Sequence, residues 1–264
     1  MNPTDSFYIE LPSNSSHKLF KDNTINKFRV NLANPLNLEG SWEVGLVEVS
    51  YPRTFYNVPL SSYFEWRMVS YDNQDPQVKS YSKPRKVSIK GGYYNSINML
   101  LSELKYQAHQ LGSAVDISFL YNTSIKQLSL IGSKNIEIRL SDKLAYVAGW
   151  NPSRWHTVED SARGSVDLTG GRYHFFLYCD CIQYQMVGDA YAPVLRTIKI
   201  TGEWGEVVSL QYTAPHYVPV SKSFIDTIAL EIRSDTGEPI DFLYGKILAK
   251  LHFRKKVTQP LLLA

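Results

Sequence analysis

The first sixty residues constrain the fold more than any other part of the chain. Three short strand-like runs, separated by polar turns without helical periodicity, occupy residues 7–16, 22–30 and 40–52. In the third run, alternation places Trp42, Val44 and Leu46 on one face. Glu48 is expected on that face as well, and Val49 on the opposite one. A chain that begins this way builds a β-sandwich or β-barrel, and none of its turns resembles a catalytic loop.

Composition supports a sizeable β-core and argues against a nucleic-acid site. The chain has 264 residues, 44% of them hydrophobic, which suffices for one large or two small domains. Its 18 Tyr and 11 Phe favour strands, because flat rings pack well on a pleated surface. The formal net charge is only +3, and the basic clusters at 83–86 and 254–256 are short. We interpret them as solvated surface, so no direct nucleic-acid site is predicted.

No targeting or membrane segment is evident. The N-terminal residues are polar and lack the apolar stretch of a signal peptide. No apolar run approaches the ~20 residues that a membrane helix needs. We therefore expect synthesis in the cytosol without a signal peptide, and no membrane span.

The middle of the chain, residues 83–150, differs in character from its flanks. Its clearest helix has an apolar face made by Ile97, Leu100, Leu101, Leu104 and Ala108. Asn95 or Ser96 is the expected N-cap, and Gly112 the expected end. A hairpin at 115–131, a strand at 136–140 and a short helix at 141–149 follow. We expect a small α+β domain, 83–150, inserted into a β-domain made of 1–82 and 151–264.

The last third of the chain returns to strands. Six are predicted, at 172–178, 183–187, 193–200, 207–212, 224–233 and 246–253. In the fifth strand Ile228, Leu230 and Ile232 alternate with Ala229, Glu231 and Arg233, as expected for one buried face. With the N-terminal strands, these make eight or more in two sets. The predicted fold class is mainly β: a single jelly-roll sandwich with an inserted small α+β domain.

The sequence offers no catalytic, cofactor-binding or metal-binding motif, so we predict that the protein is not an enzyme. Cys179 and Cys181 face the same side of one strand, but two thiols cannot complete a zinc site, and burial is expected. Asp180 and Asp189 flank predicted strands and could bind a cation. Turn hydrogen bonding and solvation explain both carboxylates better.

Aromatic residues in loops are the main interface candidates. These are Trp150, Trp155, Tyr184, Tyr191 and Trp204. Such residues are enriched at protein contacts, although they could equally cap the ends of the sandwich. The tail adds Leu261, Leu262 and Leu263, which we expect to dock on a neighbouring copy or on the chain's own core.

Several motifs, in order, resemble the minor capsid (penton) proteins of Polinton/Maverick elements, adintoviruses and virophages. They are FYIELPSNSS at 7–16, WEVGLVEVSYP at 42–52, YHFFLYCD at 173–180, IRSDTG at 232–237 and GKILAKLHFR at 245–254. The insertion joins the pattern with Gly92-Tyr-Tyr and Gly149-Trp150. The resemblance covers nearly the whole chain, and its specificity lies in the order and spacing of the motifs.

The resemblance implies a structural role. Five copies would form a homopentamer at each fivefold vertex of an icosahedral virion, beside a double-jelly-roll major capsid protein. The insertion would face outward, and a host receptor is a further partner that this position allows. The alternative is a jelly-roll binding module for a carbohydrate or host receptor, because the fold alone does not decide function. Trp150, Trp155 and Tyr191 would be its candidate contacts.

Overall fold

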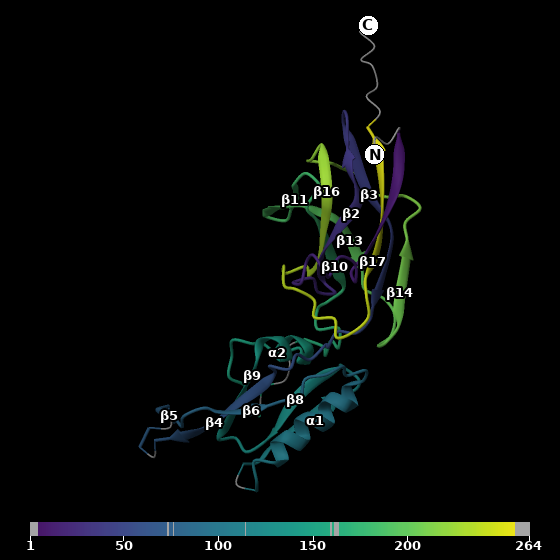
Figure 1. Ribbon diagram of the computed structural model, residues 1–264. Helices are drawn as coiled ribbons and strands as arrows, with labels where there is room; N and C mark the ends of the chain where they lie inside the picture. Colours follow the sequence, from purple (N-terminus) through teal and green to yellow (C-terminus); the bar gives the residue numbers. More distant parts are fainter. Residues whose placement is uncertain are drawn as a thin grey trace. The chain divides into compact units, whose positions relative to one another are not determined.

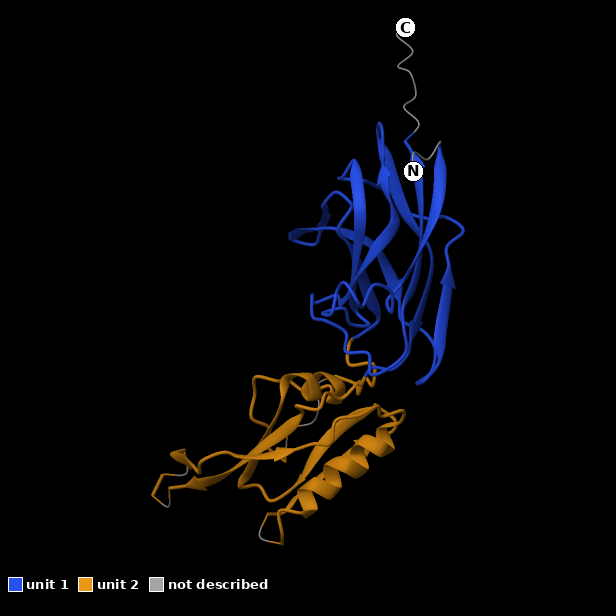
Figure 2. Cartoon of the chain, in the orientation of Figure 1, with its two compact units in different colours: residues 1–55, 172–264 blue, residues 56–171 orange. Residues whose placement is uncertain are grey.

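The chain folds into two compact units. The computed structural model describes residues 5–256 except 73, 76, 114, 159 and 161–163. Unit 1 comprises residues 1–55 and 172–264, and unit 2 comprises residues 56–171 (Figure 2). The expected boundaries at 82/83 and 150/151 both fall inside unit 2. They differ because strand β4 (Tyr63–Tyr71), expected in the sandwich, pairs instead with β6 (Arg85–Ser88) and β9 (Ile136–Leu140) of unit 2.

The described residues of unit 1 form one five-stranded and one four-stranded antiparallel sheet, besides a small hairpin. Its long strands are β1 (Ser6–Pro12), β2 (Lys27–Asn37), β3 (Trp42–Pro52), β10 (His174–Cys179), β13 (Val194–Lys199), β14 (Val207–Gln211), β16 (Phe224–Ser234) and β17 (Leu248–Lys255). One sheet has the order β1-β17-β3-β14, with the short β15 (Val218–Pro219) also paired to β3, and the other has the order β13-β10-β16-β2 (Figure 1). A separate hairpin is formed by β11 (Gln185–Val187) and β12 (Ala190–Ala192).

The pairing of these eight strands defines a jelly roll. In chain order the first pairs with the eighth, the second with the seventh, the third with the sixth and the fourth with the fifth. That pattern is an antiparallel ribbon wound into a sandwich. The predicted fold class, mainly β with a single jelly roll, is confirmed. Unit 2 enters the chain between the third strand, β3, and the fourth, β10.

The core of unit 1 lies between the inner faces of its sheets. Phe175 on β10 makes edge contacts with Tyr51, Phe55 and Phe242, with ring centroids 5.3, 5.4 and 5.8 Å away. The alternation predicted for the strand at 224–233 is present, and the last strand alternates in the same way. Ile228, Leu230, Ile232, Ile247, Ala249, Leu251 and Phe253 are all buried. Alternating sequence positions therefore supply one wall of each sheet.

The predicted alternation of β3 fails halfway along the strand. Trp42, Val44 and Leu46 are buried as expected, but Glu48 is not in the core, and Val49 is fully buried. The cause is a β-bulge: β17 pairs with Leu46 and then with Glu48, which leaves Val47 without an opposite residue. One extra residue moves every later side chain to the other face.

Unit 2 combines a small sheet, a hairpin and two helices around its own core. Besides β4, β6 and β9 it contains β5 (Lys79–Tyr81), β7 (Ile117–Asn122), β8 (Gln127–Gly132), α1 (Ile97–His109) and α2 (Asp142–Ala148). The predicted N-cap is confirmed, since the Ser96 hydroxyl accepts a hydrogen bond from the Met99 amide. Leu100, Leu104 and Ala108 are the buried residues of α1. In the described ranges, no helix is both long and apolar enough to span a membrane.

A buried amide holds the loops of unit 2 together. The Asn57 side chain donates to the carbonyl oxygens of Tyr94 and Leu168, at 2.9 and 2.7 Å. Its oxygen accepts from the Tyr94 amide at 2.9 Å. These three hydrogen bonds to backbone groups far apart in the chain fix the loop before α1. Breaking them would leave buried polar groups unpaired, which is costly.

Candidate interface residues

The hairpin of β11 and β12 presents an exposed apolar face on unit 1. Its register pairs Met186 directly with Tyr191, so these two side chains point to one face, and Tyr184 immediately precedes β11. Their exposed fractions are 66% for Tyr184, 72% for Met186 and 70% for Tyr191. A turn at Gly188, whose φ is 62°, closes the hairpin. The sequence singled out both tyrosines but missed Met186, which lies on the same ladder.

Trp204 lies in a well-tethered loop between β13 and β14. The Gly205 amide donates to the Arg53 carbonyl at 3.0 Å, and the Arg53 amide donates to the Glu206 carbonyl at 2.8 Å. The indole of Trp204 is half-buried. Its position in a fixed loop keeps it available as an interface candidate, with less free surface than the hairpin tyrosines.

Trp150 is a core residue, which corrects its assignment as an exposed loop aromatic. Only 4% of the residue is accessible. Its indole N–H donates to the Leu128 carbonyl at 3.0 Å, and its ring lies 4.6 Å from that of His156. The αL residue Gly149, with φ of 73°, ends α2 and turns Trp150 into the core of unit 2.

Trp155 is held by cations rather than presented freely. The guanidinium carbons of Arg67 and Arg139 lie 4.2 and 5.0 Å from its ring centroids. Arg67 also pairs with Glu137, and Arg139 with Glu65, each at 2.6 Å. The half-buried indole therefore completes a cross-strand ladder over β4 and β9. Leu261, Leu262 and Leu263 lie outside the described residues.

Asp180, Cys179 and Cys181 are engaged in structural contacts, whereas Asp189 is exposed in the turn between β11 and β12. The Asp180 carboxylate accepts from the Lys222 ammonium at 2.7 Å and from the Ala229 amide at 2.8 Å. Cys179 and Cys181 are buried free thiols, with their sulfur atoms 3.3 Å apart. The hydrogen bond with the Cys179 thiol, and then burial, raise the pKa of Cys181, so it stays protonated. Among the described residues, no three His, Cys, Asp or Glu side chains gather as metal ligands would.

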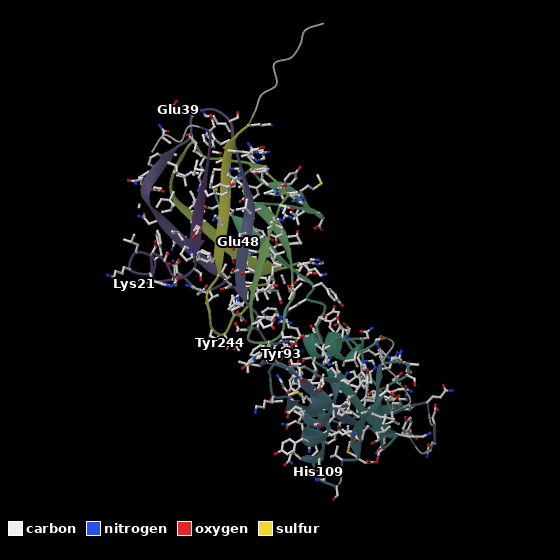
Figure 3. All side chains as sticks on the ribbon, turned by 90° about the vertical axis from the view of Figure 1, so that its right-hand side faces the viewer. Lys21, Glu39, Glu48, Tyr93, His109 and Tyr244 are labelled. Carbon is white, nitrogen blue, oxygen red and sulfur yellow. The ribbon has the colours of Figure 1, made fainter. Side chains whose placement is uncertain are left out.

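A groove beside α1 escaped the sequence reasoning. It lies between residues 90–94 and the helix face that carries Asn98, Ser102 and Tyr106. Figure 3 labels Tyr93 in this loop, and also His109, the last residue of α1. The available signal was the i, i+4, i+8 spacing of these three residues behind a Gly-Gly-Tyr-Tyr segment. They lie on the face opposite the apolar stripe and look like ordinary helix surface.

Comparison with known proteins defines the fold. No protein-family model matches the chain, and no curated protein matches it. Among solved structures it is similar to the mavirus penton protein, with 12% sequence identity and a TM-score of 0.51, over 95% of this chain and 100% of that one. It also aligns with the Sputnik virophage structure, at 13% identity and a TM-score of 0.47, over 96% and 99%. The jelly roll with its insertion is thus an arrangement also found in a virophage penton protein.

Proposed function

We propose that this protein is a penton, a minor capsid subunit of which five copies close each fivefold vertex of an icosahedral shell. One observation carries the proposal: the structural alignment with the mavirus penton protein covers 95% of this chain, so it extends over the insertion as well as the jelly roll. A shared sandwich alone would say little, because jelly rolls serve many functions. The match includes the inserted unit, which a generic sandwich lacks.

The role requires geometry rather than catalysis. A closed ring of five uses one heterologous interface, repeated by rotation until the ring closes. The subunit then needs two different surfaces that are complementary to each other, and no active site. A source among Polinton/Maverick-type elements is part of the proposal. So are a position at the virion vertex, after synthesis in the host cytosol, and contact with a double-jelly-roll major capsid protein.

The hairpin face is the strongest candidate for one side of the ring contact. Met186 and Tyr191 lie opposite each other on one exposed face, and Tyr184, also exposed, lies next to β11. Aromatic residues and methionine are enriched at the buried centres of protein interfaces. Trp204 remains a candidate on the same unit, and the three tail leucines are proposed as a further docking element.

Sedimentation velocity across a concentration series tests the assembly. We expect a discrete species of about five times the 30.2 kDa of one chain. Tyr191→Ala and Trp204→Ala should weaken that species while the monomer stays folded. Tyr146→Ala is the matched control, since Tyr146 is equally exposed, at 64%, and lies in unit 2. A monomer at every concentration would remove self-assembly as an intrinsic property, and an intact oligomer in both variants would exclude these two residues.

A binding module is the second candidate function, and one observation favours it. The contacts first assigned to it do not form a common surface, because Trp150 is buried and Trp155 is held between arginines. The groove beside α1 offers a different and better-formed site. The two functions are compatible in one protein, since a vertex subunit can carry a ligand site on its insertion.

A further inference from the structure

Unit 2 has an open groove along α1 that the proposed ring contacts do not use. Its cavity volume is 670 Å³, within the usual size of small-molecule sites. One wall is the segment 90–94, and the other is the exposed face of α1 from Asn98 to Tyr106. Both walls belong to unit 2, so the groove is complete within one compact unit.

The helix wall carries hydrogen-bonding groups that are available to a ligand. Asn98, Ser102 and Tyr106 follow one another at intervals of four residues and so form a single stripe. Within the described part of the chain, neither the Asn98 amide nor the Ser102 hydroxyl makes a side-chain hydrogen bond. Together they provide donors and acceptors that face the groove in an unoccupied state.

A fixed carboxylate lies beside this stripe. One oxygen of Glu103, Oε1, accepts from the Lys90 amide at 3.0 Å and from the Gln107 side chain at 2.9 Å. Its second oxygen, Oε2, has no hydrogen bond to any described residue. The carboxylate is thus held in place by one oxygen while the other can accept from a ligand. A positioned acceptor of this kind lowers the entropy cost of binding.

The opposite wall is rigid and aromatic. The Tyr94 hydroxyl donates to the Lys90 carbonyl at 2.5 Å, and burial together with the Glu103 charge raises the pKa of Tyr94 to about 12. The hydroxyl therefore keeps its proton and its bond. Gly91 packs so tightly that an added Cβ would lie 2.4 Å from the Leu60 Cα, and at Gly92 no side chain fills the groove.

The composition of the lining selects the class of ligand. Tyr93, Tyr94 and Tyr106 supply aromatic surface, and 59% of Tyr106 is exposed. The lining carries one positive and one negative side chain, Lys90 and Glu103, which gives no net charge to attract phosphate or nucleic acid. A peptide strand finds no free backbone edge at Gly92, because its N–H and C=O are bonded to Val58 at 2.8 and 3.1 Å.

We propose that this groove binds a neutral saccharide. The apolar C–H face of a pyranose ring stacks on Tyr106, while the ring hydroxyls bond to Asn98, Ser102 and the free oxygen of Glu103. Aromatic surface with a few well-placed polar groups suits a ligand that has one apolar face and a polar rim. The site goes beyond the proposed role in the shell and does not depend on the oligomer.

Saturation-transfer NMR on the full chain tests the proposal. The probes are methyl β-D-galactoside, methyl β-D-glucoside, methyl α-D-mannoside and N-acetylglucosamine, each at millimolar concentration, with glucose 6-phosphate and trialanine as comparators. We expect transfer to the ring protons of at least one neutral saccharide, strongest on one face of the ring. The charged sugar and the peptide should give much less.

Two variants locate the site, and a third controls for general effects. Tyr106→Ala and Asn98→Ala should each reduce the saturation transfer at least fivefold, with an unchanged melting temperature, because both side chains are exposed and alanine favours the helix. Tyr146→Ala, equally exposed on α2, should match the wild type. The proposal would be overturned if no neutral saccharide received saturation transfer, or if either comparator received more than the neutral saccharides. It would also be overturned if both groove variants gave the same transfer as the wild type. Sedimentation of the wild type reports on the shell role independently.

Discussion

The two units reach stable cores by opposite routes. Unit 1 is built from two separate stretches of chain, and its outer pair joins Ser6 to Arg254 across almost the full sequence. Unit 2 is one continuous stretch, and its hairpin joins Ile117 to Gly132 over a short loop. Distant pairing carries a larger loop-closure cost, so we expect the jelly roll to fold more slowly than the insertion.

Because each unit has its own core, one unit can vary without disturbing the core of the other. Each unit has its own cluster of fully buried apolar side chains. A jelly roll can therefore accept a large insertion after its third strand without sharing its core with it. The ligand site proposed on unit 2 and the ring contact proposed on unit 1 could then vary independently.

The largest effect on stability should come from truncating one buried aromatic side chain in the core of either unit. Phe175 in unit 1 and Phe119 in unit 2 are both fully buried aromatic residues. Replacing either with alanine should lower the stability of its own unit by about 3–5 kcal/mol, from lost burial and the cavity left behind. Differential scanning calorimetry should resolve two transitions, with Phe175→Ala lowering one and Phe119→Ala the other.

The pair of variants is its own control, because the substitution is chemically identical in both. If each variant lowered both transitions by the same amount, the two units would unfold as a single cooperative body. The two cores would then not be independent in stability.

A smaller effect is expected at Trp155. Removing this ring takes one cation–π contact from Arg67, which keeps its contact with Tyr81, and one from Arg139, which together should cost unit 2 about 1–2 kcal/mol. Trp155→Phe should cost less, since a phenyl ring retains part of the interaction. Urea unfolding measures both. An unchanged unfolding midpoint combined with weakened assembly in Trp155→Ala would instead make Trp155 an interface residue, as the sequence suggested.

The smallest effect is a pH dependence confined to unit 1. The pKa of His252 lies below its ordinary value of 6.5, because burial disfavours the imidazolium and Arg254 adds a positive charge. The folded unit thus binds this proton less readily than the unfolded chain. The stability that neutral His252 contributes to the folded state is fully present above pH 6.5 and is lost as the pH falls below that value.

Melting curves between pH 7.5 and 5.5 check this sign. His252→Gln cannot titrate but can still accept from the Tyr217 hydroxyl, which lies 2.7 Å from the His252 Nδ1. The unit 1 transition of the wild type should fall more on acidification than that of the variant, by about 1–2 °C. Equal slopes, or a difference in the unit 2 transition, would contradict the assignment.

Sequence reasoning succeeded where structure depends on near neighbours. The N-cap at Ser96 and the alternation of β16 were predicted because both follow from local hydrogen bonding or a two-residue repeat. It failed where the environment of a residue depends on a partner that is distant in the sequence. Trp150 was placed correctly after a helix, yet its burial depends on the Leu128 carbonyl, and the groove beside Tyr106 requires a loop folded back on the helix.

The sequence by itself determined that this chain alternates strands in two sets around a helical insertion, and hence its jelly-roll class. Only the tertiary structure decided to which unit β4 belongs, on which face Glu48 lies, and which aromatic side chains are exposed. The physical reason is that side-chain periodicity reports a strand's faces but not its partner, and a single bulge opposite β17 reverses those faces.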